Sequence, residues 1–145
     1  MRALTIRQPW AAAITYADKR VENRTWPTSY RGPVLIHAGR TLDARHGPMV
    51  ASVVKGLQLE LGAVLAVARI TECHPDDGEC TPWSMKGMHH FVLDEVTALP
   101  LPIPHRGAQG LWTPPAVLVD RVRELLEAEG TARVLREDTG PEVPW

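Results

Sequence analysis

The sequence predicts an α+β domain organised around a small, barrel-like sheet. Short strand-like segments alternate with three scattered helical segments, which is the pattern of an α+β or barrel-like domain. Residues 62–70 form the most apolar stretch and predict a central strand, because a strand buried on both faces is apolar throughout. The clearest helix is expected over residues 113–130. A chain of 145 residues has the size of one compact domain.

The strands are predicted from alternation of apolar and polar residues or from short apolar runs. They are residues 3–6, 21–26, 34–38, 62–70, 91–96 and the end of 107–112. Residues 99–103 alternate with prolines and predict an edge strand or an extended connector, because proline cannot donate to a ladder. Residues 131–136 are expected to add a short edge strand.

The helices are predicted from 3.6-residue spacing and from their end signals. Pro9 suits the first turn of a helix that ends near Asp18, and residues 43–57 hold a second helix. In the third, Thr113 is a suitable N-cap and Gly130 a suitable end. Its buried stripe is expected at Val119, Val122, Leu125 and Leu126.

Composition limits the function classes. A net charge of -1 gives no whole-molecule attraction to nucleic acid or membrane, but arginines outnumber lysines by thirteen to three. Residues 1–45 hold many arginines and few acids, so a local basic face is expected. Two cysteines make no secreted disulfide framework, and no apolar run approaches the roughly 20 residues of a membrane span. We therefore expect a cytoplasmic protein without membrane association.

Residues 19–37 are the part of the chain that is richest in groups able to recognise a ligand. Together with the predicted strand-to-helix junction before them, they are expected to line one cleft. The expected binding residues are Arg7, Gln8, Lys19, Glu22, Asn23, Arg24, Trp26, Arg31 and His37. The cations suit phosphate or sugar, Gln8, Glu22 and Asn23 suit base edges, and Trp26 suits stacking on a base. The alternatives are a capping role for Gln8, a carboxylate partner for Arg31 and a hydrogen-bonded core position for His37.

The same segments resemble the signature of ASCH domains, which belong to the PUA-like superfamily. The motifs are Ile6-Arg7-Gln8-Pro9-Trp10-Ala11, Lys19-x-x-Glu22-Asn23-Arg24-x-Trp26, Tyr30-Arg31-Gly32-Pro33, Ile36-His37-Ala38 and Gly107-x-x-Gly110-Leu111-Trp112. The resemblance implies a PUA-like small β-barrel with surrounding helices over residues 1–112. Residues 113–145 are an added C-terminal helix and tail, which we expect to pack on the same domain, with the tail frayed from Glu137.

The resemblance implies binding of RNA, of single-stranded or duplex DNA, or of a nucleotide-like small ligand. Some ASCH proteins resemble ribonucleases, and one branch looks like amidohydrolases of acylated cytidine, with a threonine three residues after the lysine. Here Glu22 stands in that position after Lys19. The first alternative is therefore a hydrolase with Lys19 and Glu22 as a catalytic acid–base pair. The second is a protein-interaction module using residues 119–126; the chain is expected to be a monomer or weak homodimer.

Cys73-His74-x5-Cys80, with His89-His90 nearby, offers residue types that could bind zinc. The spacing is not that of a paired zinc knuckle, so two reduced thiols in and beside a loop are expected instead. The prediction is therefore no metal and no cofactor.

Overall fold

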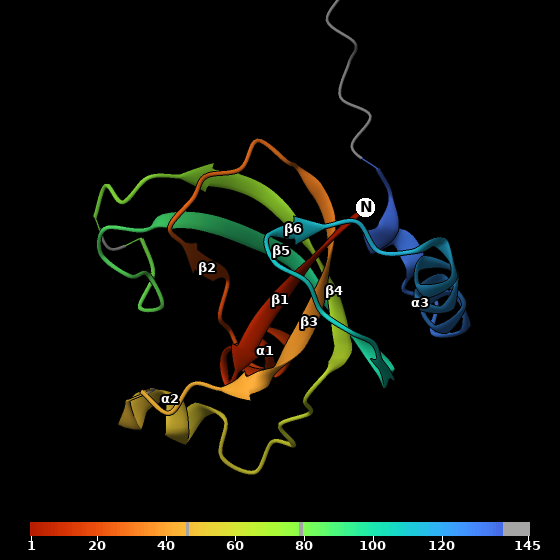
Figure 1. Cartoon of the computed structure of the whole chain (residues 1–145), viewed down its shortest axis with the longest axis horizontal. Helices are drawn as coiled ribbons and strands as arrows, with labels where there is room; N and C mark the ends of the chain where they lie inside the picture. The colour runs from red at the N-terminus through yellow and green to blue at the C-terminus, as the bar shows by residue number, and fades with distance from the viewer. Residues whose placement is uncertain (46, 79, 138–145) are drawn as a thin grey trace, which may run out of the picture.

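The backbone forms one curved sheet with helices on both of its faces (Figure 1). The structure is a computed structural model that describes residues 1–45, 47–78 and 80–137. The strands are β1 (Arg2–Gln8), β2 (Val21–Arg24), β3 (Gly32–Leu42), β4 (Ala63–His74), β5 (His89–Pro104) and β6 (Leu111–Trp112). The helices are α1 (Trp10–Tyr16), α2 (Pro48–Val53), α3 (Ala116–Ala128) and the 3-10 helix η1 (Ala132–Leu135). The predicted fraying of the tail concerns residues that, beyond Glu137, lie outside the described part.

The strand order in the sheet is β2-β5-β4-β3-β1-β6. β1 and β3 pair in parallel, and the other neighbours are antiparallel. The sheet curls into a half-barrel, and its two ends approach each other across α1 (Figure 1). The expected α+β, barrel-like fold is confirmed. No described helix is both long enough and apolar enough to cross a membrane.

One side chain bridges the gap between the two ends of the half-barrel. β6 pairs only with Ala3 and Leu4 of β1, so the carbonyl of Thr5 beyond them has no strand partner on that side. Arg24 of β2 donates to this carbonyl at 2.9 Å. A strand edge that is left open exposes unpaired backbone groups, and here a guanidinium satisfies one of them. This contact places Arg24 beside β1.

Two predicted segments, 91–96 and 99–103, are parts of the single strand β5. β2 covers only the first residues of β5, so the proline-rich second half pairs with β4 alone and has one open side. The second half of β5 is therefore an edge, as its prolines predicted. On the side away from β4 no strand accepts hydrogen bonds, so the missing N–H groups of the prolines cost nothing there. Residues 131–136 were predicted as a strand, and this is wrong, because they hold the 3-10 helix η1. Arg69 donates to the carbonyl of Val134 in η1 and to that of Arg136 just after it.

The apolar side chains form a core on each face of the sheet. On the inner face, α1 packs against β1, β3 and β4, and its alanines allow close approach because they have no side chain beyond Cβ. On the outer face, α3 and η1 cover Ala3, Leu35 and Val67. The C-terminal segment thus closes the second core.

The buried stripe of α3 is Leu118, Val122 and Leu126. Val122 and Leu126 were predicted correctly, but Val119 and Leu125 lie only half-buried and Leu118 was not predicted. Thr113 is not the N-cap: the helix begins after Pro115, and Thr113 instead accepts a hydrogen bond from Arg2.

Leu126→Ala is expected to lower the free energy of unfolding by about 2–5 kcal/mol, because a fully buried leucine is replaced by a cavity. Urea unfolding followed by circular dichroism measures this. Val117→Ala on the same helix is the control, since Val117 is 81% exposed. Equal effects of the two substitutions would show that α3 does not depend on the outer core.

Candidate functional site

Three adjoining clefts of about 450, 440 and 440 Å³ lie beside β1. Thr5 lines all of them, Arg7, Arg24 and Trp26 line the first two, and Arg40 lines the first and third. We call the three together the groove. The second cleft is the Trp pocket, which is lined by Trp10, Trp26 and Trp83 among others. Its volume lies within the roughly 300–1,000 Å³ that is usual for small-ligand sites.

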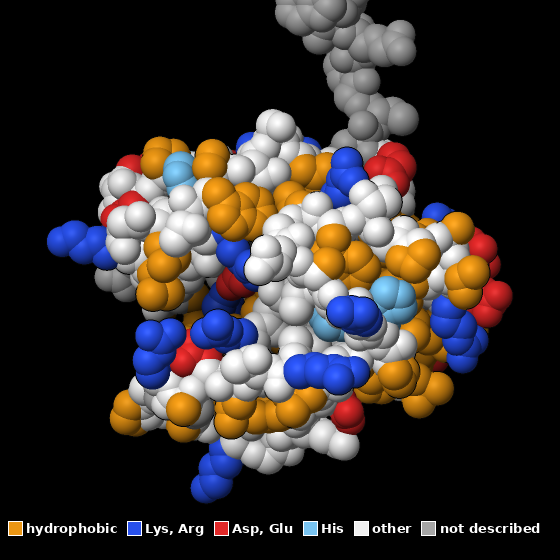
Figure 2. All heavy atoms as spheres, in the orientation of Figure 1, with side chains coloured by type: hydrophobic (Ala, Val, Ile, Leu, Met, Phe, Trp, Pro, Cys, Tyr) orange, Lys and Arg blue, Asp and Glu red, His pale blue; other side chains and the backbone are white. Residues whose placement is uncertain are grey.

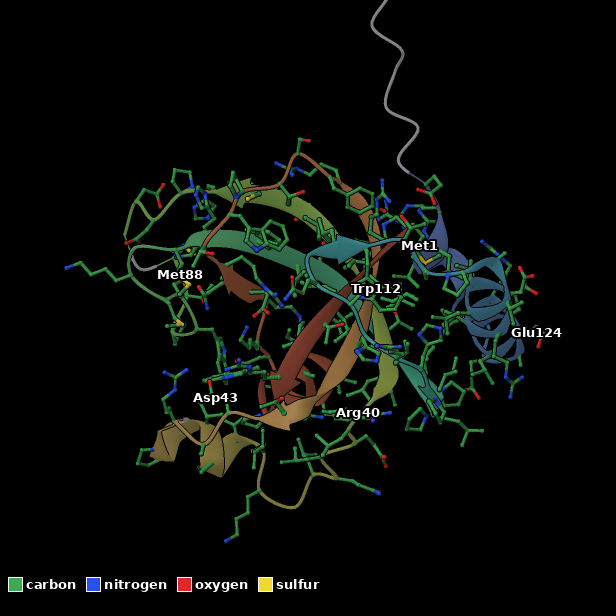
Figure 3. The ribbon with its side chains drawn as sticks, in the orientation of Figure 1. Met1, Arg40, Asp43, Met88, Trp112 and Glu124 are labelled. Carbon is green, nitrogen blue, oxygen red and sulfur yellow. The ribbon has the colours of Figure 1, made fainter. Side chains whose placement is uncertain are left out.

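The groove is basic although the chain is nearly neutral. Its described lining has six cationic side chains and two carboxylates: Arg7, Lys19, Arg24, Arg40, Arg45, Arg106, Glu22 and Asp43. Figure 2 shows Lys and Arg side chains around a hollow left of the centre, with hydrophobic side chains at its edge. Figure 3 labels Arg40 and Asp43 at its lower side. Charge of one sign in a hollow concentrates anionic ligands there.

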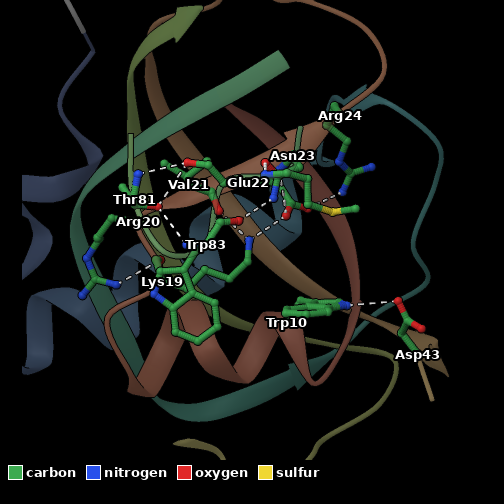
Figure 4. A network of polar contacts seen from close by, with 12 residues as sticks. Trp10, Lys19, Arg20, Val21, Glu22, Asn23, Arg24, Asp43, Thr81 and Trp83 are labelled. Carbon is green, nitrogen blue, oxygen red and sulfur yellow. Dashed lines mark hydrogen bonds and ion pairs between the residues drawn. The ribbon is translucent and has the colours of Figure 1, made fainter. Parts of the chain in front are cut away.

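Lys19, Glu22 and Arg24 meet at the floor of the Trp pocket (Figure 4). Lys19 Nζ lies 2.9 Å from Glu22 Oε1, and Arg24 Nη2 lies 2.9 Å from Glu22 Oε2. The alternation of β2 puts Glu22 and Arg24 on one face, as the sequence predicted. Lys19 is only 2% exposed, and it also donates to the carbonyl of Val21 and lies 6.0 Å from the Trp10 ring centroid.

The position of Glu22 makes it a charged acceptor at neutral pH. Burial by itself would raise the pKa of Glu22, but the charges of Lys19 and Arg24 and their hydrogen bonds together lower it below its usual 4.5. A general base works best with a pKa near the working pH, so a carboxylate with a lowered pKa is a poor one near neutrality. Glu22 therefore fixes the two cations rather than exchanging protons.

Asn23 uses both ends of its amide within the protein. Its Nδ2 donates to the carbonyl of Trp83 at 2.9 Å, and its Oδ1 accepts from the backbone N–H of Met85 at 2.9 Å. These two bonds hold residues 83–85 against β2. Asn23 thus shapes one wall of the Trp pocket, a different task from the base-edge reading expected from the sequence.

Gln8 is fully buried and lies outside the lining of the groove. Its Oε1 accepts from the backbone N–H of Ala12 at 3.0 Å, so it satisfies one of the open donors at the start of α1. Its Nε2 donates to the carbonyl of Glu60 at 2.8 Å. The geometry matches the capping alternative, and the burial of Gln8 keeps its amide away from a base in the groove.

Arg31 lines none of the three clefts. It donates to the carbonyls of Thr28 and Tyr30 and so holds the turn before β3.

His37 lines the third cleft but is 1% exposed. Its Nε2 donates to the carbonyl of His105 at 2.7 Å, which leaves Nδ1 to accept from the Thr5 hydroxyl at 3.2 Å. Burial lowers the pKa of His37, so the ring is neutral.

Gly107 completes this His37 cluster. A Cβ at Gly107 would lie 2.6 Å from Thr5 Oγ1 and 2.8 Å from His37 Cε1, closer than real Cβ contacts allow. The glycine of the Gly107-x-x-Gly110-Leu111-Trp112 motif is therefore required by the close approach of this loop to β1 and β3. Trp112 then donates from Nε1 to Thr5 Oγ1 at 3.1 Å.

Aromatic rings form the apolar part of the Trp pocket. Trp26 packs edge-to-face on Phe91, with ring centroids 5.1 Å apart, and remains partly exposed. Trp10 donates from Nε1 to Asp43 Oδ2 at 3.2 Å, and its ring forms part of the pocket wall. Trp83 is mostly buried. Trp26 and Trp10 can therefore each offer ring surface to a ligand.

The sequence matches the ASCH domain family over residues 4–101. The chain belongs to the ASCH domain family. This confirms the family expected from the motifs and, with the observed half-barrel, the PUA-like fold. A comparison with curated proteins finds no match.

The groove of this ASCH domain contains arginines that its motifs do not indicate. Arg40, Arg45 and Arg106 lie outside the set of residues that the sequence predicted to bind a ligand. Arg40 is near the end of β3 and Arg106 follows β5, so only the pairing of these strands with their neighbours brings Arg40 to the cleft that Arg7 lines and Arg106 to the adjoining cleft that Arg40 also lines. The one feature of the sequence that hinted at these additional binding arginines was the excess of arginine over lysine. The side chains of Arg7, Arg40 and Arg106 are exposed and make no hydrogen bond or ion pair with the other described residues.

Proposed function

We propose that this ASCH domain binds single-stranded nucleic acid along the groove and takes one unstacked base into the Trp pocket. The observation that carries the proposal is the position of Arg7. It lines both the aromatic Trp pocket and the first cleft, where Arg40 also lies. Exposed arginines without partners among the described residues are available to phosphates, which they bind in a planar fork.

A single strand fits this arrangement better than a duplex. An aromatic wall in a concave pocket needs a base whose face is free, and bases in a duplex are stacked and paired. Trp26 and Arg24 both line the first two clefts, so a base on Trp26 would bring its own phosphate toward the first cleft. We therefore expect the RNA or DNA partner to bind through unpaired segments. A nucleotide-like small ligand would be recognised by the same aromatic rings and arginines.

Catalysis by Lys19 and Glu22 is less well supported. Both Glu22 oxygens accept hydrogen bonds from the protein, and the pKa of Glu22 is lowered by its two cationic neighbours although burial opposes this. A proton acceptor with such partners has little capacity to take a proton from a substrate or water. Binding is therefore the function that this geometry supports best.

Fluorescence anisotropy with labelled oligonucleotides tests the proposal. Single strands of RNA and DNA of about 12 nucleotides should bind more tightly than the duplex of the same sequence. Affinity should fall with salt, with a slope of about −0.7 per phosphate contact on logarithmic axes. Preference for the duplex, or binding without salt dependence, would contradict the proposal.

The double variant Arg7→Gln, Arg40→Gln is expected to weaken single-strand binding for every sequence tested. It should also reduce the salt slope by about 0.7 for each phosphate that the protein no longer binds. Arg121→Gln, Arg123→Gln on α3 is the matched control, because those arginines are exposed and lie outside the groove. Equal weakening in the control would show that binding follows total charge and not the groove.

A further inference from the structure

A cluster of two histidines and one cysteine lies where β4 passes into β5. His74 ends β4 and pairs with His90 near the start of β5. Cys80 lies on the loop between the two strands, which extends at the left of Figure 1. The antiparallel pairing fixes both histidines on the rigid sheet, and the loop folds back to bring the thiol to them.

The distances within this cluster suit a shared ion. One ligand atom from each of His74, Cys80 and His90 can be chosen so that all three lie within 4.8 Å of one another. Cys80 Sγ is 3.5 Å from His90 Nδ1. Zinc bonds of about 2.3 Å to sulfur and 2.0–2.1 Å to nitrogen at a tetrahedral angle place those two atoms about 3.5 Å apart.

Hydrogen bonds leave the required lone pairs free on both rings. His90 Nε2 lies 2.9 Å from the carbonyl of Met85, and a carbonyl only accepts, so the ring proton is on Nε2 and Nδ1 carries the lone pair. His74 Nδ1 lies 2.9 Å from the carbonyl of Pro75 and 3.6 Å from Asp77 Oδ1, so its proton is on Nδ1 and Nε2 is free. Carbonyl and carboxylate partners of this kind are what orients histidine ligands in metal sites.

We propose that His74, Cys80 and His90 bind one zinc ion through His74 Nε2, Cys80 Sγ and His90 Nδ1. Imidazole and thiolate are the ligands of tetrahedral zinc sites, whereas Mg²⁺ and Ca²⁺ require oxygen ligands. The Cys80 thiol loses its proton to solvent when the zinc–sulfur bond forms. Three protein ligands leave the fourth tetrahedral position to water.

The ion would stabilise a wall of the groove. The loop that carries Cys80 also carries Trp83, Met85 and Met88 of the Trp pocket, and Asn23 and His90 already hold it by hydrogen bonds to Trp83 and Met85. Zinc bound to Cys80 would attach this loop to the sheet at one more residue, three positions before Trp83. The inference does not depend on nucleic-acid binding, because it concerns these three ligands only.

Cobalt substitution of the full-length, chelator-treated protein tests the site. One equivalent of Co²⁺ should give tetrahedral d–d bands and a thiolate-to-cobalt charge-transfer band, and zinc should displace both. Cys80→Ser should abolish the charge-transfer band and weaken zinc binding at least about 100-fold. His74→Asn should weaken binding in the same way, with folding checked by circular dichroism.

Cys73→Ser and His89→Ala are the matched controls, since each removes a neighbouring side chain of the same type that is not part of the cluster. Both should bind one zinc ion with unchanged affinity. In the wild-type protein, zinc should protect one of the two thiols from alkylation, and that thiol should be Cys80. Absence of the charge-transfer band, or equal loss in Cys73→Ser, would overturn the proposal and leave a hydrogen-bonded thiol beside two histidines.

Discussion

Replacing Glu22 with alanine is expected to lower the free energy of unfolding by about 3–5 kcal/mol, because the substitution leaves Lys19 buried without its counter-charge. It also removes the partner that orients Arg24 toward Thr5, so the bridge between the two ends of the half-barrel weakens. Chemical denaturation of both proteins at neutral pH measures the difference.

Two further variants separate the buried charge from other effects of Glu22→Ala. Glu124→Ala removes an ion pair with Arg121 on the surface of α3 and should change stability little, because solvent screens exposed pairs. Lys19→Met combined with Glu22→Leu should recover part of the loss, since a buried pair replaced by apolar groups leaves no lone charge. If Glu124→Ala is as destabilising as Glu22→Ala, burial of the pair is not the cause.

The stabilisation by Glu22 should also depend on pH in a definite direction. Although burial opposes it, Lys19 and Arg24 hold the pKa of Glu22 in the folded protein below its usual 4.5. The contribution is therefore complete above pH 4.5 and is lost as the pH falls through the folded pKa. The difference in unfolding free energy between wild type and Glu22→Gln should shrink over that acidic range and stay constant above it.

Trp26→Leu is expected to weaken binding of single-stranded RNA by about 5- to 150-fold, the equivalent of about 1–3 kcal/mol for one stacked base. Leucine keeps an apolar contact with Phe91 but offers no flat ring to a base. Trp26→Phe keeps a smaller ring and should lose less. Anisotropy titrations on variants that circular dichroism shows to be folded give the comparison.

Tyr16→Leu is the control for Trp26→Leu, since it removes an exposed aromatic ring that lies outside the groove. Its affinity should equal that of the wild type. An unchanged affinity in Trp26→Leu would mean that the Trp pocket does not hold a base. The arginines of the groove would then account for binding by themselves.

Local patterns in the sequence predicted which segments form strands more reliably than the residues at which each strand begins and ends. Alternation located β1 and β2, and a short apolar run located β3, which extends well beyond the predicted residues 34–38. The two halves of β5 were separated by their prolines, and only pairing with β4 shows that they are one strand. The segment of η1 was predicted as a strand because the contacts that hold it as a 3-10 helix cannot be read from its own residues. These contacts are the hydrogen bond from Arg69 and the packing in the outer core, which both involve residues distant in sequence.

The sequence by itself determined the family, the α+β class and the meeting of Lys19, Glu22 and Arg24, since these depend on motifs and on contacts between near neighbours. The tertiary structure decided which polar groups remain free. Gln8 and Asn23 are occupied by Glu60, Trp83 and Met85, which lie far away along the chain. Arg40 and Arg106 reach the groove, and His74 meets His90, only through strand pairing. Whether a polar side chain is available depends on its partners in space, and those partners are set by the closure of the half-barrel.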